Sequence, residues 1–175
     1  MKTSKIVLRI EVREPSRMMF DGYDAFAHVM VCFNRWNSDK GDYEHLSDYT
    51  DGAFQVTAFS CQIDASSKDS NSYGWTLGLR GGTPEHPCAM DKVEDSLKLM
   101  RKLRKAYDEM CKIAGNPMTF GQFVAYHTSK LRMEVLVKSV HGGLMLCEAA
   151  DLTRLIDTRV TQLREKCQEV AKRAS

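Results

Sequence analysis

The chain has 175 residues, of which 43% are hydrophobic and 27% charged, with a formal net charge of +2. This composition is ordinary for a globular protein, and the length suffices for one domain with a buried core. No apolar run approaches the roughly 18 residues of a membrane-spanning helix, and Arg9 and Glu11 interrupt the first apolar stretch where a secretory signal would stay apolar. We therefore expect a single cytoplasmic domain over residues 1–175, without membrane insertion.

Period-two alternation of apolar residues predicts four strands in the first half of the chain. They cover residues 5–13, 23–36, 53–63 and 73–79. The second is apolar on both alternating sets, so we expect it to be central and covered on both faces over part of its length. The connections, including residues 37–52 and 64–72, are loops of turn-forming residues, which implies an antiparallel meander.

Capping signals predict three helices in the second half. Asp91 with Glu94 opens a helix that runs to Ala114, where Gly115 caps its end. Thr119 with Gln122 repeats the capping box and predicts a shorter helix to about Lys130, although the apolar residues there also fit the alternation of a strand. Apolar residues at helical spacing predict a last helix from residue 151 to about 173.

Between the last two helices, alternation from Leu131 to Val137 and the turn at 141–143 predict a hairpin that returns through 144–147. The predicted order is therefore ββββ-α-α-ββ-α. This order is typical of an α+β fold, with a largely antiparallel sheet, a four-strand meander plus a later hairpin, and three helices packed on one face.

The six cysteines are scattered and form no CxxC pair. Most occupy apolar positions of the strand and helix patterns, which favours buried free thiols in a reducing compartment. Disulfides in an oxidising compartment are the alternative. The cysteines are Cys32, Cys61, Cys88, Cys111, Cys147 and Cys167.

Residues 78–91 are the most enzyme-like stretch, because three glycines precede a predicted helix and Cys88 lies close to His86. The spacing of the glycines fits neither a P-loop nor a dinucleotide fingerprint, and a zinc deaminase would need a second cysteine at the position of Asp91. We expect a turn between strand and helix, and predict no catalytic residue and no cofactor.

Metal ligation has two weak candidates. His28, His127 and His141 form no pair at helical spacing and are more typical of hydrogen-bonded core histidines. The acidic stretch after the second strand matches no EF-hand spacing, so we expect a solvated loop and no metal. Its carboxylates are Asp39, Asp42, Glu44, Asp48 and Asp51.

One stripe of the first predicted helix is basic and lies opposite the apolar face. It comprises Lys98, Arg101, Lys102, Lys105 and Lys112. Such a stripe could follow the phosphates of a nucleic acid, although Glu109 in its middle weakens the field and a solvated surface is the plainer interpretation. Formal charge is −3 through Met90 and +5 from Asp91 onward, which is modest for a dedicated nucleic-acid binder.

The connection between the first two predicted strands carries Arg17, Met18, Met19 and Phe20. Arginine, methionine and aromatic residues are enriched in interface cores. The alternative is that the second strand begins at Arg17 and buries these residues in the sheet.

The leading hypothesis is thus a small protein-binding module, of inhibitor or adaptor type, that occupies the surface of a partner protein of unknown identity through Arg17, Met18, Met19 and Phe20. Self-association of two copies is a second use of the same patch. A nucleic-acid-binding module that uses the basic stripe is the alternative, and an enzyme centred on residues 78–91 is third.

Overall fold

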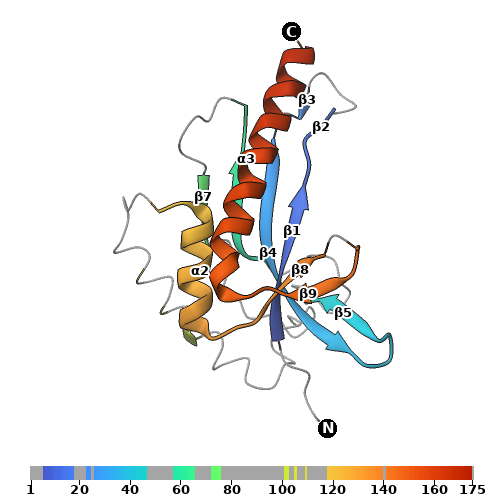
Figure 1. Ribbon diagram of the computed structural model, residues 1–175, viewed down its shortest axis with the longest axis vertical. Coiled ribbons are helices and arrows are strands. Elements are labelled where there is room, and N and C mark those ends of the chain that lie inside the picture. The colour runs from blue at the N-terminus through green and yellow to red at the C-terminus, as the bar shows by residue number, and fades with distance from the viewer. Residues whose placement is uncertain are drawn as a thin grey trace, which may run out of the picture.

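A computed structural model describes residues 6–17, 23–24, 26–46, 57–65, 72–75, 101–102, 105, 109, 118–139 and 141–174. The strands are β1 (Ile6–Arg13), β2 (Ser16–Arg17), β3 (Tyr23–Asp24), β4 (Ala27–Asn37), β5 (Asp42–His45), β6 (Thr57–Ile63), β7 (Ser72–Trp75), β8 (Val135–Lys138) and β9 (Leu144–Leu146). The helices whose bounds the described residues give are α2 (Phe120–Leu131) and α3 (Ala149–Ala174). The fold is α+β, and Figure 1 shows α2 and α3 running antiparallel beside the curled sheet.

The predicted meander is present in β1, β4, β6 and β7. The sheet order is β7-β6-β4-β1-β8-β9, and β5 is a further partner of β4. β4 is central, as its two-sided apolar pattern predicts, because β1 lies along one edge while β6 and then β5 lie along the other. The pairing of β4 with β6 shifts register between Val31 and Cys32, and such a bulge bends a strand and increases its twist.

The prediction of a largely antiparallel sheet needs correction, because β1 also pairs with β8 in parallel. Leu8 lies opposite Val135 and Arg9 opposite Leu136, so the sheet is mixed. Alternation along a chain identifies strands but not which distant strands pair. A parallel pair requires a long crossover connection, and the chain between β1 and β8 supplies one that includes α2.

Two predicted boundaries are wrong. The strand expected from Leu131 begins at Val135, because Leu131 is the last residue of α2 and Arg132 ends that helix in the left-handed conformation, with φ 53°. The stretch expected as a loop after the second strand contains β5. Its turn is closed by Asn37, whose side-chain Oδ1 accepts hydrogen bonds from the backbone N–H groups of Asp39 (3.0 Å) and Lys40 (3.2 Å).

The capping box at the start of α2 decides between helix and strand for residues 119–130. Thr119 Oγ1 accepts from the Gln122 backbone N–H at 3.1 Å, and the Thr119 N–H donates to Gln122 Oε1 at 3.0 Å. The predicted shorter helix is therefore confirmed, as is the last helix. Of the helix predicted over 91–114, the described residues Arg101, Lys102, Lys105 and Glu109 are helical. The rest lies outside the described residues.

Both helices contribute to one hydrophobic core on one face of the sheet. Aromatic side chains of α2 meet the strands there, with the Phe123 ring packing edge-on to the Phe59 ring at a centroid distance of 5.8 Å. The core of buried residues includes Leu8, Val29, Val31, Phe33, Phe59, Ile63, Phe120, Phe123, Val124, Leu152, Ile156 and Leu163. The expectation that helices pack on one face of the sheet is correct for α2 and α3.

The described cysteines are free thiols, as predicted. Cys32, Cys61 and Cys167 are buried and Cys147 is partly buried. Burial raises the pKa of Cys32 and of Cys61 to about 12. These two thiols are therefore protonated and unreactive near neutral pH. Cys88 and Cys111 lie outside the described residues.

Candidate anion-binding pocket

The residues of the first predicted interface fall at the far end of the β1–β4 hairpin. Arg17 belongs to β2 and pairs with Tyr23 of β3, so the chain reverses between them. The second predicted strand thus does not begin at Arg17, because its long central part, β4, starts at Ala27. Met18, Met19 and Phe20 lie outside the described residues, and their role as an interface stays a prediction.

The enzyme-like stretch 78–91, with His86 and Cys88, also lies outside the described residues. Among the histidines, His127 is a core residue, as predicted. Its ring packs edge-on against the Phe123 ring at 4.5 Å, and burial lowers the pKa of the imidazole to about 4. His28 is only partly buried, and His141 is exposed, so the expectation of a core histidine is wrong for His141.

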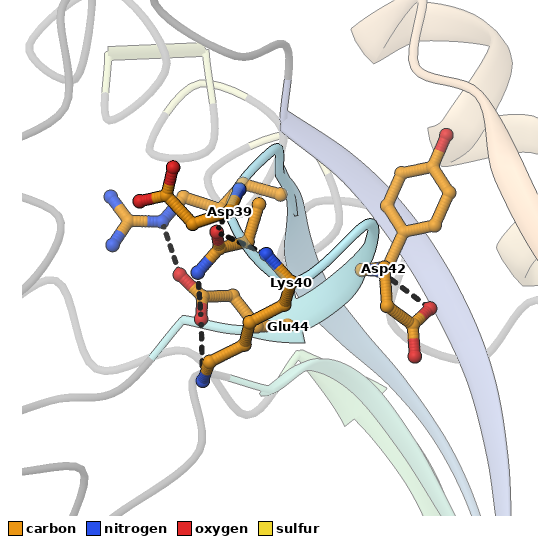
Figure 2. A network of polar contacts seen from close by, with 7 residues as sticks. Asp39, Lys40, Asp42 and Glu44 are labelled. Atoms are coloured by element: carbon orange, nitrogen blue, oxygen red, sulfur yellow. Dashed lines mark hydrogen bonds and ion pairs between the residues drawn. The ribbon is translucent and has the colours of Figure 1, made fainter.

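Glu44 of the acidic stretch is the centre of a hydrogen-bond network at the β4–β5 turn. Glu44 accepts hydrogen bonds from Asn37 Nδ2 (3.0 Å), Arg35 Nε (3.2 Å) and Lys40 Nζ (3.4 Å), as Figure 2 shows. The Asn37 hydrogen bond is the main cause that lowers the pKa of Glu44. The described part of the chain holds no cluster of three His, Cys, Asp or Glu residues suited to a metal. Asp48 and Asp51 lie outside it.

A second polar cluster lies between β1 and β5. Glu11 Oε1 contacts Nε2 of His45, and the Arg9 Nε lies 3.5 Å from the same oxygen. The Cys32 thiol lies near this cluster, and Glu11 contributes to its raised pKa, although burial is the larger cause. With its thiol protonated, the cluster offers no activated sulfur nucleophile.

The basic stripe is where the structure brings separate segments together. A pocket of about 440 Å³ opens between the described helical residues of the stripe and the end of α2. We call it the basic pocket. Among its described lining residues, four side chains are cationic and one is a carboxylate. Its described lining is Lys102, Lys105, Glu109, Lys130, Leu131 and Arg132.

Glu109, the carboxylate in the described lining of the basic pocket, forms an ion pair with Lys130. Lys130 Nζ donates to Glu109 Oε2 at 2.6 Å and also lies 4.6 Å from the centre of the Tyr126 ring. The hydrogen bond with Lys130 lowers the pKa of Glu109, and the same bond raises the pKa of Lys130. Glu109 is therefore compensated locally. The side chains of Lys102, Lys105 and Arg132 remain exposed, and none of them hydrogen-bonds or ion-pairs with a described residue.

Sequence reasoning found half of this pocket. Lys102 and Lys105 belong to the predicted stripe, Arg101 is exposed but does not line the pocket, and Lys98 and Lys112 lie outside the described residues. Lys130 and Arg132 were missed. Basic residues are common at the C-terminal end of a helix because they interact favourably with the helix dipole. The positions of Lys130 and Arg132 in the sequence therefore do not indicate a site shared with another segment.

A groove of about 310 Å³ adjoins the basic pocket between the second half of α2, the β8–β9 hairpin and the start of α3. Arg132 lines both hollows. The groove is lined by Ala125, Thr128, Ser129, Arg132, Met133, Glu134, Val135, Leu146, Cys147, Glu148, Ala149 and Leu152. Its polar and apolar side chains are mixed, unlike the cationic lining of the basic pocket.

No helix in the described part of the chain is long and apolar enough to cross a membrane. No family model, curated protein or solved structure matches the chain. Any function has to be argued from the side chains of the basic pocket and its surroundings.

Proposed function

We propose that this protein binds nucleic acid through phosphate groups held at the basic pocket. The observation that carries the proposal is the convergence of Lys102 and Lys105 with Lys130 and Arg132 around one hollow. Lysine and arginine side chains neutralise nucleic-acid phosphates, and the counterions that are released drive binding.

The arrangement of charge supports a bound anion. Lys130 forms a hydrogen bond with Glu109 and Lys105 adds a weaker electrostatic interaction with it, so the described lining keeps an excess of positive charge. An arginine can grip a phosphate with two parallel hydrogen bonds, whereas a lysine acts as a point charge. Arg132 would thus orient the phosphate, and Lys102 and Lys105 would strengthen its attraction.

The test is fluorescence anisotropy with labelled single-stranded and duplex DNA at salt concentrations from about 50 to 200 mM. Lys102→Glu combined with Lys105→Glu should weaken binding to every sequence. It should also flatten the salt dependence, because each lost phosphate contact lowers the slope by about 0.9 on duplex DNA and about 0.7 on single strands.

Lys172→Glu combined with Arg173→Glu is the matched control. It changes the net charge by the same amount as the Lys102→Glu and Lys105→Glu variant. The change lies at the C-terminal end of α3, which is at the top of Figure 1 and far from the C-terminal end of α2. Equal losses in the two variants would show that overall charge, not the basic pocket, governs binding. Absence of binding by the wild type at low salt would refute the proposal.

A protein-binding module is the second candidate, and one observation favours it. β2 and β3 form a separate two-stranded ribbon, and Phe26, just after that ribbon, is 44% exposed. Apolar side chains in such a place fit an interface. Met19→Asp combined with Phe20→Asp should then abolish partner binding or self-association, measured by affinity capture and by sedimentation. Leu155→Asp, at an exposed apolar position on α3, should leave association intact.

A further inference from the structure

The groove beside the basic pocket holds a buried hydroxyl that no described residue satisfies. Thr128 is 6% exposed, and its Oγ1 has no hydrogen-bond partner within the described structure. Most buried polar side-chain atoms have such a partner, so an exception calls for an explanation. A ligand in the groove would supply one.

Two carboxylates, those of Glu134 and Glu148, also line the groove, and they would repel a phosphate. Glu148 lies just before α3, is exposed, and makes no ion pair with a described residue. A carboxylate repels phosphate but accepts hydrogen bonds from amino groups, and in nucleic-acid recognition Asp and Glu accept from the amino group of cytosine. The basic pocket and the groove therefore suit different parts of one ligand.

Apolar side chains complete the groove. Leu152 and Val135 are buried members of its lining, and Leu146 of β9 is 52% exposed. Flat, apolar base faces pack on such side chains. A volume of about 310 Å³ lies at the small end of the range of about 300 to 1,000 Å³ for ligand sites. This is room for one base but not for a duplex.

We propose that the basic pocket and the groove form one site for single-stranded nucleic acid, with a phosphate in the basic pocket and an adjacent base in the groove. This inference rests on the proposed function and specifies its substrate. Arg132 joins the two halves, because it lines both hollows. Duplex DNA keeps its bases stacked and paired, so it could occupy only the phosphate half.

The polar groups of the groove also set a base preference. Glu148 as an acceptor, and Thr128 as donor or acceptor, favour a base with an exocyclic amino group, such as cytosine, over thymine, which lacks one. One hydrogen bond of about 1 kcal/mol corresponds to about a fivefold change in affinity. Oligo(dC) should therefore bind at least about fivefold more tightly than oligo(dT) of equal length.

The experiment compares labelled oligo(dC), oligo(dT) and duplex DNA on the wild type, Thr128→Val and Glu148→Gln. Both variants should reduce the preference for oligo(dC) over oligo(dT), while the salt slope stays that of the wild type. Glu165→Gln, at an exposed carboxylate on α3, is the control and should keep the full preference. Because Glu148 is exposed, its variant carries the test even if Thr128→Val is poorly folded.

The outcomes separate the two proposals. One outcome is that the wild type binds oligo(dC), oligo(dT) and duplex DNA with equal affinity, and that the Lys102→Glu and Lys105→Glu variant loses this binding. It would overturn the single-strand site but leave the proposed phosphate binding in place. A preference for oligo(dC) that both groove variants retain would also overturn it. Failure of the wild type to bind any of the three at low salt would overturn the proposed function with it.

Discussion

A close contact between α2 and α3 at Gly121 makes this position sensitive to substitution. A Cβ atom at this position would lie 2.5 Å from the backbone oxygen of Thr153 and 2.6 Å from Asp157 Oδ1. The first contact is with the backbone of α3, so a rotamer change cannot relieve it. Gly121→Ala must therefore push α2 and α3 apart or tilt the first turn of α2 away from α3.

Either response removes a cap. Asp157 Oδ1 accepts from the Gly121 backbone N–H at 2.8 Å, and its Oδ2 accepts from Thr119 Oγ1 at 2.7 Å, so a residue of α3 satisfies the first turn of α2. Overpacking costs about 1–3 kcal/mol and loss of a cap about 1 kcal/mol. The better helix propensity of alanine returns about 1 kcal/mol. The expected net loss is about 1–3 kcal/mol.

Thermal and urea unfolding followed by circular dichroism measure this loss. At about 2–4 °C per kcal/mol for a domain of this size, Tm should fall by about 2–12 °C. Ser129→Ala, on the exposed side of α2, should stay within about 0.5 kcal/mol of the wild type. Asp157→Ala should reproduce the loss of the cap without the clash. A Tm of Gly121→Ala at or above that of the wild type would refute the close helix contact.

Three further predictions concern single side chains. Arg132→Gly should raise the free energy of unfolding by about 1 kcal/mol, because glycine adopts φ 53° without strain, yet weaken oligonucleotide binding in the anisotropy assay. Burial lowers the pKa of His127 from 6.5 to about 4. Below pH 6.5 the imidazole is therefore protonated in the unfolded state but stays neutral in the folded state, which favours unfolding. Stability should then drop by about 2–4 kcal/mol between pH 7 and 4, and His127→Leu should flatten that drop in urea unfolding. A hydrogen bond from Lys166, and a smaller effect from Arg159, lower the pKa of Glu14 below 4.5. The two interactions therefore stabilise the fold above pH 4.5, and this stabilisation is lost as the pH falls through the lowered pKa. Since these side chains are largely exposed, Glu14→Gln should lower the free energy of unfolding by at most about 1 kcal/mol at pH 7 and leave it unchanged at pH 2.

Local signals predicted the elements well where short-range chemistry determines them. The Thr119–Gln122 capping box located the start of α2, and the two-sided apolar pattern identified β4 as central. The same signals failed where a partner is distant. The parallel pairing of β1 with β8 depends on a crossover, and β5 forms because the Asn37 side chain closes a turn in a stretch rich in loop-forming residues.

The candidate site was only partly predictable for the same reason. Spacing along one helix placed Lys102 and Lys105 on a common stripe, but it could not show that the end of α2 faces them. The sequence could not predict that the Thr128 hydroxyl lacks a hydrogen-bond partner, because this depends on how the neighbours of α2 bury the side chain. A threonine within a predicted helix most often faces solvent or bonds its own backbone.

The four cations that line the described part of the basic pocket differ in how strongly each indicates a ligand. Lys130 and Arg132 lie at the end of α2, where the helix dipole stabilises positive charge, so the fold alone explains them. Lys102 and Lys105 come from a different segment and add like charges around the same hollow, which repel. If this repulsion serves binding, the Lys102→Glu and Lys105→Glu variant should be at least as stable as the wild type while it binds nucleic acid more weakly. A loss of both stability and binding would instead mark the two lysines as structural, and would remove the reason to regard the hollow as a site.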